Sequence, residues 1–198
     1  MREYFNDILN CIRNSLETLD ENMMNQLLSE CHKAVESGGK IVASGLGKNV
    51  PVCEKFIGTL HSMGISGAFL HTNTALHGDL GVIRNGDLVI LLSKSGNTEE
   101  TVTLARLLKE RGIVTWLISF SPFSTLSEMI EKKIVLNLEC EGDDWDIVPN
   151  NSSAIYLIVL QGLAVMLGRR IGVTRDVFLS NHPGGSIGKL YIREESHT

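Results

Sequence analysis

The sequence has few of the features that mark secreted, metal-binding or nucleic-acid-binding proteins. It contains only four cysteines in 198 residues, and no two of them form a Cys-x-x-Cys pair. Scattered cysteines support neither a disulfide framework nor a cysteine zinc site, so free thiols are expected. No histidines are spaced as a metal-binding pair, so neither a metal nor a cofactor is expected. The formal net charge of -5 argues against a nucleic-acid-binding surface.

No segment has the pattern of a signal peptide or a comfortable membrane span. The N-terminal stretch MREYFNDILNCIRN carries charges throughout, whereas a signal peptide needs an apolar core. The longest apolar stretch, residues 154–168, is short for a membrane-spanning helix and is interrupted by Gln161. A soluble cytoplasmic protein that contacts neither membrane nor nucleic acid is therefore expected.

Apolar strands alternate with helices along most of the chain. Apolar residues at helical spacing predict two leading helices, the second over residues 21–36. The alternation that follows predicts an α/β fold, in which helices cover both faces of a parallel sheet. There is no repeat, linker or low-complexity tract, so one domain is expected. The predicted strands are residues 40–45, 67–72, 87–93, 115–120 and 133–139.

Three polar loops follow predicted strands. They are SGLGKN after the first strand, SKSGNT after the third and EGDDWDIVPNNSS after the last. In open parallel sheets, ligands bind at the carboxyl ends of the strands, where loops lead into helix N-termini. Because all three loops leave the same edge of the sheet, we expect them to meet in one site.

The loop SKSGNT has the composition of an anion-binding cradle. Ser93, Ser95 and Thr98 each offer a hydroxyl donor, and Gly96 lets the backbone approach a ligand closely. The following helix would direct its free N–H groups and positive dipole end to the same point. A phosphate, held without a formal counter-charge, fits best. For Thr98 alone, an ordinary helix N-cap is an equally good explanation.

SGLGKN resembles two nucleotide-binding motifs and matches neither. It lacks the first glycine of the P-loop and has Asn49 where that motif needs Ser or Thr. It also has Val50 in place of the third glycine of the dinucleotide-binding motif. What remains is a tight turn whose Lys48 can reach a phosphate or an oxyanion.

Two histidines and one acidic segment are further candidates for acid–base chemistry. His77 lies in ALHGDLG, and His182 lies in NHPGGSIG, where Pro183 and two glycines fix an irregular backbone. His182 is the better candidate because a structural need for it is not obvious. In the segment LECEGDDWD, a carboxylate whose pKa is raised by partial burial would serve as an acid or base. The carboxylates there are Glu139, Glu141, Asp143, Asp144 and Asp146.

Four motifs in this order resemble the SIS (sugar isomerase) domain family, and within it the arabinose-5-phosphate isomerase branch. They are Gly-x-Gly-Lys after a strand, His-Gly-Asp-Leu-Gly, Ser-x-Ser-Gly-x-Thr-x-Glu, and Leu-Ser-x-His-Pro-Gly-Gly-x-x-Gly. The resemblance implies a three-layer, five-stranded parallel sheet of the flavodoxin-like kind within a single domain over residues 1–198. Helices in residues 1–37 would pack on or between subunits, ahead of an α/β core over residues 38–190. A homotetramer with sites at subunit interfaces is also implied.

The resemblance further implies an activity, the cofactor-free interconversion of D-ribulose 5-phosphate and D-arabinose 5-phosphate through an enediolate. In chemical terms, Glu100 suits proton abstraction, and Lys48 or a histidine suits the enediolate oxygen. His182 would assist ring opening or the second proton transfer. The implied catalytic residues are Lys48, Glu100, Glu141, His182 and His77. The implied phosphate-binding residues are Ser44, Asn49, Ser93, Ser95, Thr98 and Ser152.

The sequence departs from the family pattern at several site positions. Asn49 and Asn97 replace the usual Ser and Glu, and residues 142–151 differ from the expected Ala-Cys-Pro segment. Two alternatives therefore stay open, an SIS isomerase of another ketose phosphate such as a hexulose phosphate, and a regulatory module that binds a sugar phosphate without catalysis. Many relatives continue into a pair of CBS modules that this sequence lacks, so nucleotide regulation through such modules is expected to be absent or to lie on another chain.

Overall fold

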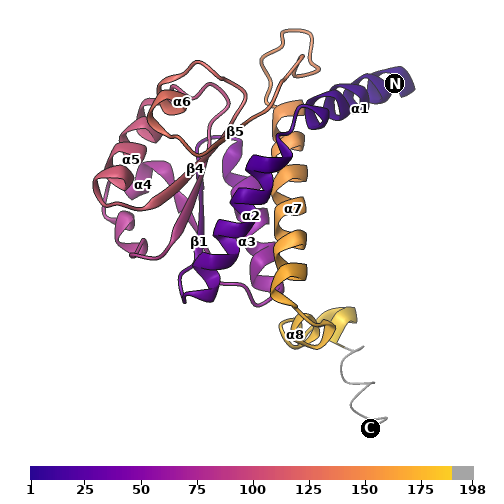
Figure 1. Ribbon diagram of the computed structural model, residues 1–198. Helices are drawn as coiled ribbons and strands as arrows, with labels where there is room; N and C mark the ends of the chain where they lie inside the picture. The colour runs from indigo at the N-terminus through magenta and orange to yellow at the C-terminus, as the bar shows by residue number, and fades with distance from the viewer. Residues whose placement is uncertain (189–198) are drawn as a thin grey trace.

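A computed structural model of the chain, which describes residues 1–188, shows one five-stranded sheet between two layers of helices (Figure 1). All neighbouring strands run parallel, in the order β2-β1-β3-β4-β5. This order confirms the predicted flavodoxin-like fold. The predicted end of the core at residue 190 lies outside the described residues. The strands are β1 (Ile41–Gly45), β2 (Gly67–His71), β3 (Leu88–Leu92), β4 (Val114–Ser119) and β5 (Lys133–Val135).

Several α-helices and one 3-10 helix accompany the strands. The second helix has the predicted bounds, because the Asp20 carboxylate accepts hydrogen bonds from the backbone N–H groups of Asn22 and Met23 and caps it. The helices are α1 (Arg2–Glu17), α2 (Glu21–Glu36), α3 (Asn49–Ser62), α4 (Thr72–Ala75), η1 (Asp79–Val82), α5 (Glu99–Glu110), α6 (Thr125–Met129), α7 (Asn151–Ile171) and α8 (Arg175–Ser180).

The central strands are buried on both faces, as continuous apolar runs predict. Every residue of β3 is buried, and its side chains alternate between two hydrophobic clusters. Leu88 and Ile90 face the layer formed by α2, α3 and α7, whereas Val89 and Leu91 face the layer formed by α4, α5 and α6. This alternation follows from the two-residue period of a strand.

Three short helices were not predicted from the sequence, and the predicted fifth strand ends too late in the chain. The helices α4, η1 and α8 have only four to six residues, too few for a periodic pattern. The fifth strand was predicted to reach residue 139 but ends at Val135. The last residue of β4, Ser119, pairs with Val135, so the chain beyond it has no neighbouring strand to pair with.

The helix α7 has 21 residues and is long and apolar enough, by length and composition, to cross a membrane. The length of this segment therefore does not exclude a membrane span, contrary to the prediction from sequence. Burial argues against a span instead, because Ile155, Leu160 and Leu163 are fully buried in the core. The helix packs against α1, α2 and α3. A core helix explains its composition.

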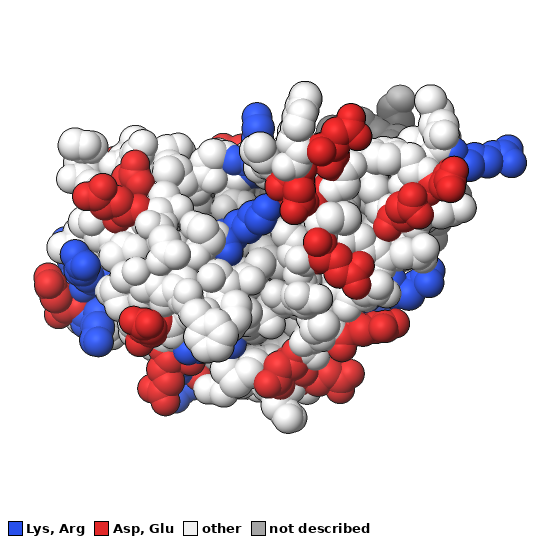
Figure 2. Space-filling view, turned by 90° about the horizontal axis from the view of Figure 1, so that it is seen from above, with Lys and Arg blue, Asp and Glu red and all other residues white. Residues whose placement is uncertain are grey.

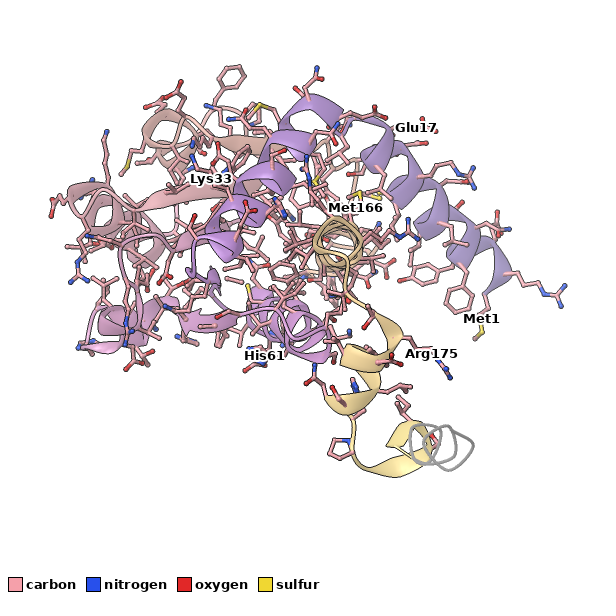
Figure 3. All side chains as sticks on the ribbon, turned by 60° about the horizontal axis from the view of Figure 1, so that its bottom comes forward. Met1, Glu17, Lys33, His61, Met166 and Arg175 are labelled. Carbon is pink, nitrogen blue, oxygen red and sulfur yellow. The ribbon has the colours of Figure 1, made fainter. Side chains whose placement is uncertain are left out.

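The carboxyl ends of the strands meet at the top of the molecule in Figure 1, and Figure 2 shows the face seen from there. Acidic side chains are spread over this face, and basic ones are fewer. The N-terminal part of α1, near Met1, extends outward from the rest of the chain (Figure 3), whereas Cys11 and Ser15 farther along the helix are buried. Its apolar side chains Tyr4, Phe5 and Leu9 are exposed.

Candidate functional site

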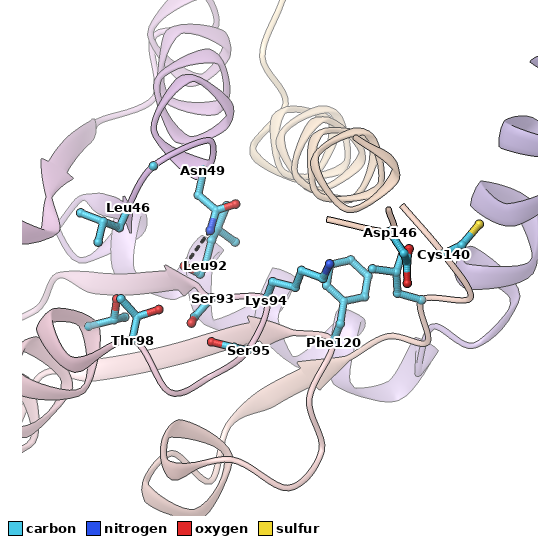
Figure 4. A pocket seen from close by; sticks show the side chains of 13 residues that line it. Leu46, Asn49, Leu92, Ser93, Lys94, Ser95, Thr98, Phe120, Cys140 and Asp146 are labelled. Atoms are coloured by element: carbon cyan, nitrogen blue, oxygen red, sulfur yellow. Dashed lines mark hydrogen bonds between the residues drawn. The ribbon is translucent and has the colours of Figure 1, made fainter. Parts of the chain in front are cut away.

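A cavity of about 570 Å³ lies at the carboxyl edge of the sheet, within the size range of small-molecule sites (Figure 4). Residues from all three predicted loops line it, so the expected convergence is confirmed. The lining residues are Leu46, Gly47, Asn49, Leu92, Ser93, Lys94, Ser95, Thr98, Thr101, Phe120, Leu138, Cys140 and Asp146.

The hydroxyls of the SKSGNT loop are held as donors toward the cavity. Ser93 Oγ accepts a hydrogen bond from the Gly96 N–H at 3.1 Å, and Ser95 Oγ accepts one from the Asn97 N–H at 3.3 Å. Each oxygen is thus fixed by a backbone donor, while its own O–H stays available for a ligand. Two hydroxyls oriented in this way suit an anion such as phosphate.

Thr98 occupies the N-cap position of α5 but does not cap it with its side chain. The side chain lines the cavity instead. The N-cap explanation is therefore wrong for the hydroxyl, which remains available to a ligand. The first N–H groups of α5 begin beside the same cavity and add the positive end of the helix dipole.

The loop is held against the start of α6 by Gly96 and Asn97. Gly96 has φ +65°, and a Cβ added there would lie 2.0 Å from Ser124 Oγ. Asn97 Oδ1 accepts hydrogen bonds from the Thr125 N–H at 2.9 Å and from Thr125 Oγ1 at 3.0 Å. Asn97, which replaces a carboxylate of the family pattern, therefore joins two loops of the site.

An ion pair joins a lysine that lines the cavity to a buried glutamate behind it. Lys94 Nζ lies 2.5 Å from Glu141 Oε1, and the Glu141 side chain is fully buried. The carboxylate also accepts hydrogen bonds from Ser152 Oγ at 2.7 Å, from the Ser152 N–H at 2.9 Å and from the Asn150 N–H at 3.0 Å. Lys94 thus brings a cation into the cradle, but Glu141 already neutralises it.

These contacts decide the charge of Glu141. Burial alone would raise the pKa of this carboxyl group, but the hydrogen bonds from Lys94, Ser152 and Asn150 outweigh burial and hold the pKa below its usual value of 4.5. The expectation of a carboxylate with a raised pKa is therefore wrong for Glu141. It is a fixed anion that anchors the start of α7.

The other predicted phosphate-binding residues lie deeper or have their donors engaged. Ser44 is fully buried, with its Oγ 3.1 Å from Thr72 Oγ1, and it does not line the cavity. Ser152 does not line it either, because its hydroxyl donates to Glu141. Asn49 lines the cavity, but its Nδ2 donates to the Leu92 carbonyl at 3.2 Å (Figure 4).

Three of the predicted catalytic residues lie near the carboxyl edge without lining the cavity. Lys48 is exposed between two lining residues, at the start of α3, and Glu100 is half-buried in the first turn of α5. His77 is exposed in the turn that follows α4. These positions make Lys48 and Glu100 residues of the rim.

His182 lies far from the cavity of its own chain. It follows α8, which lies at the end of α7 opposite the cavity (Figure 1). A 21-residue helix spans roughly 30 Å at 1.5 Å per residue. The ring of His182 packs 4.3 Å from that of Phe178, and its Nδ1 lies 2.6 Å from the Phe178 carbonyl oxygen. One chain therefore does not bring His182 to the other predicted site residues.

Several residues that line the cavity were not predicted from the sequence. Lys94 lies between Ser93 and Ser95, but only the hydroxyls of that loop are predicted to bind a ligand. Thr101 follows Thr98 at helical spacing, which places both on one face of α5. Asp146 is one of five carboxylates in an acidic segment, where no signal sets it apart, and no motif marks Phe120. Within residues 1–188, no group of three or more His, Cys, Asp or Glu side chains is placed to hold a metal ion.

Comparison with known proteins identifies the family of the chain. A family model of the SIS domain matches residues 35–167, more than half of the chain. The arabinose 5-phosphate isomerase KdsD of Yersinia pestis is 31% identical over 96% of this chain, and that of Pseudomonas aeruginosa is 32% identical over 91%. The chain spans only 59% and 55% of the length of these two relatives.

Two solved structures share the fold. An Escherichia coli CFT073 protein in complex with arabinose 5-phosphate superimposes with a TM-score of 0.85 at 27% identity, over 92% of this chain and 95% of that one. The Vibrio vulnificus NanR protein, complexed with ManNAc-6P, gives a TM-score of 0.75 at 18% identity, over 90% of this chain and 66% of that one. By its matching domain and its fold, the chain belongs to the SIS domain family.

Proposed function

We propose that the protein is an aldose-ketose isomerase that interconverts D-ribulose 5-phosphate and D-arabinose 5-phosphate through an enediolate. The observation that carries the proposal is the cavity, in which three hydroxyls with free O–H groups and the start of α5 converge. Such a cradle suits the phosphate. Similarity to the KdsD relatives and to the protein in complex with arabinose 5-phosphate supports the choice of sugar.

Isomerisation needs a base for the proton beside the carbonyl and a donor for the developing enediolate oxygen. Glu141 suits neither role, because four hydrogen bonds occupy its oxygens and a low pKa makes it a weak base. We assign it a positioning role, in which it neutralises Lys94. Glu100 remains the candidate base, and Lys48 the candidate donor at the rim of the cavity.

We also infer that a second copy of the chain completes the site, within the homo-oligomer that the family resemblance implies. His182 lies at the far end of α7, so it can act only in the cavity of another copy. The exposed apolar side chains of α1 support such an assembly, because monomeric proteins rarely leave an apolar helix face uncovered. A tetramer is the expected form.

The direct test is incubation with ribulose 5-phosphate in deuterated water, followed by NMR. We expect arabinose 5-phosphate to appear with deuterium at the carbon that exchanges its proton. The Ser93→Ala, Ser95→Ala double variant should bind the sugar phosphate on the order of 100-fold more weakly, because two hydrogen bonds to a charged group are lost. Binding of unphosphorylated ribulose should change much less.

The possible results separate the alternatives. Binding without turnover or exchange would point to a regulatory module, and turnover of a hexulose phosphate alone would replace the substrate. Equal weakening of phosphorylated and unphosphorylated sugar in the double variant would contradict the phosphate cradle.

A mixing experiment tests the shared site. The variant His182→Ala lacks the histidine, and the Ser93→Ala, Ser95→Ala variant lacks the cradle, so each homogeneous preparation should be nearly inactive. When the two are unfolded and refolded together, mixed oligomers contain some sites with an intact cradle from one chain and His182 from another. We expect activity to return in the mixture. A mixture as inactive as its components, with mixed oligomers confirmed by native mass spectrometry, would exclude a shared site.

A further inference from the structure

A carboxylate lines the cavity on a segment that departs from the family pattern. Asp146 belongs to residues 142–151, and it lines the same cavity as the hydroxyl loop. In Figure 4, Ser93, Ser95 and Thr98 lie on one side of the cavity and Asp146 lies on the other. The two sides therefore offer opposite chemistry, hydroxyl donors on one and a carboxylate on the other.

No cation balances Asp146 within residues 1–188. Its Oδ1 accepts a hydrogen bond from the backbone N–H of Glu141 at 2.5 Å, and it forms no ion pair there. Lys94 is the one basic residue among the lining residues, and Glu141 neutralises it at 2.5 Å. The side of the cavity away from the hydroxyl loop thus carries an uncompensated negative charge.

The segment holds Asp146 in place. The Asp143 carboxylate accepts hydrogen bonds from the backbone N–H groups of Trp145, Ile147 and Val148, on both sides of Asp146. Asp146 itself has φ +56°, in the left-handed region that Asp and Asn tolerate best among residues with side chains. Its position is therefore set by the fold of the segment.

We propose that Asp146 is a specificity-determining residue, which restricts the cavity to sugars that carry a single phosphate and are otherwise uncharged. It would accept hydrogen bonds from sugar hydroxyls at the end away from the phosphate. A second phosphate or a carboxylate at that end would face a like charge, which rejects the wrong ligand by repulsion. This inference rests on the proposed function, because it concerns the same cavity.

Asp146→Asn is the appropriate variant, because it removes the negative charge and keeps the size and shape of the side chain. An asparagine retains the Oδ1 acceptor for the Glu141 N–H, and it tolerates the same backbone conformation. Asp146→Gly removes the charge by a second route, since glycine adopts a positive φ without strain. Asp144→Asn is the matched control, because Asp144 is exposed two residues away and does not line the cavity.

Calorimetry would give the dissociation constants of ribulose 5-phosphate and ribulose 1,5-bisphosphate for the wild type and the three variants. We expect the wild type to prefer the monophosphate, and both Asp146 variants to shift the ratio of the two constants toward the bisphosphate by about tenfold. Asp144→Asn should leave the ratio unchanged. The ratio compares two ligands on one protein, so partial unfolding of a variant does not alter it.

The outcomes distinguish a failure of the proposed function from a failure of the role proposed for Asp146. A wild type that binds no ribulose 5-phosphate contradicts the proposed function. A wild type that binds it, together with Asp146 variants whose ratio does not move, overturns the role of Asp146 alone. An equal shift in the Asp144 variant would overturn it as well, because the effect would then come from overall charge.

Discussion

Replacing Gly96 by alanine is expected to lower the free energy of unfolding by about 3 kcal/mol, from left-handed strain and a steric clash together. Gly96 has φ +65°, where any Cβ is strained. The added Cβ would also lie 2.0 Å from Ser124 Oγ and 2.6 Å from Ser124 Cβ. The clash pushes the loop away from α6, so Ser93 Oγ loses its bond from the Gly96 N–H and binding of ribulose 5-phosphate weakens.

Gly112 provides the matched control at the other end of α5. Its φ is +66°, almost the same as that of Gly96, but a Cβ added there meets no atom within 4 Å. Gly112→Ala should therefore cost only the backbone strain, about 1 kcal/mol, and leave binding unchanged. Urea denaturation and calorimetry on the two variants measure both effects. Equal losses of stability would show that the contact with Ser124 does not constrain the loop.

The fold was predictable because its main signal is local. A buried parallel strand has a continuous apolar sequence, and the helices between such strands have an apolar stripe, so the alternation defines the class. Short elements escape this reasoning. Whether β5 continues beyond Val135 depends on the length of β4, since a strand needs a partner. No residue of the fifth strand carries that information.

The site was predictable in part, for a related reason. Ser93, Ser95 and Thr98 follow one strand directly, so the sequence places them together at the edge of the sheet. The ion pair of Lys94 with Glu141 joins loops from different strands, and no local pattern specifies which carboxylate of an acidic segment turns inward. His182 is separated from the cavity by the length of α7, a distance that appears only in three dimensions.

Glu141 and Asp146 show that carboxylates of one acidic segment can have opposite environments. Both lie within six residues, and the Asp146 carboxylate accepts a hydrogen bond from the backbone N–H of Glu141. Glu141 is buried with four hydrogen-bond donors, whereas Asp146 is exposed at the cavity without a cation. Composition predicts a charged loop, but the backbone decides which carboxylate anchors the fold and which lines the cavity.

Replacing Glu141 by glutamine is expected to lower the free energy of unfolding at pH 7 by about 2 kcal/mol, because buried hydrogen bonds to a charged acceptor are lost, while the half-exposed Lys94 is solvated instead. The carboxylate accepts from four donors, on Lys94, Ser152 and Asn150. A glutamine keeps one acceptor oxygen and turns an NH2 group toward donors that it cannot satisfy. Glu139→Gln is the control, because Glu139 is exposed and the same chemical change there should alter stability little.

The loss of stability caused by Glu141→Gln should also depend on pH, and the pKa of Glu141 in the folded protein sets the direction. The folded pKa lies below the usual 4.5, so the unfolded chain binds more protons at this group than the folded chain does. The stabilisation is complete above the unfolded pKa and is lost as the pH falls from 4.5 through the folded value. Chemical denaturation from pH 7 down to pH 3 should therefore show the wild type approaching the variant in stability. A difference between them that stays constant over this range would mean that size and shape, and not the charge of Glu141, account for the loss of stability.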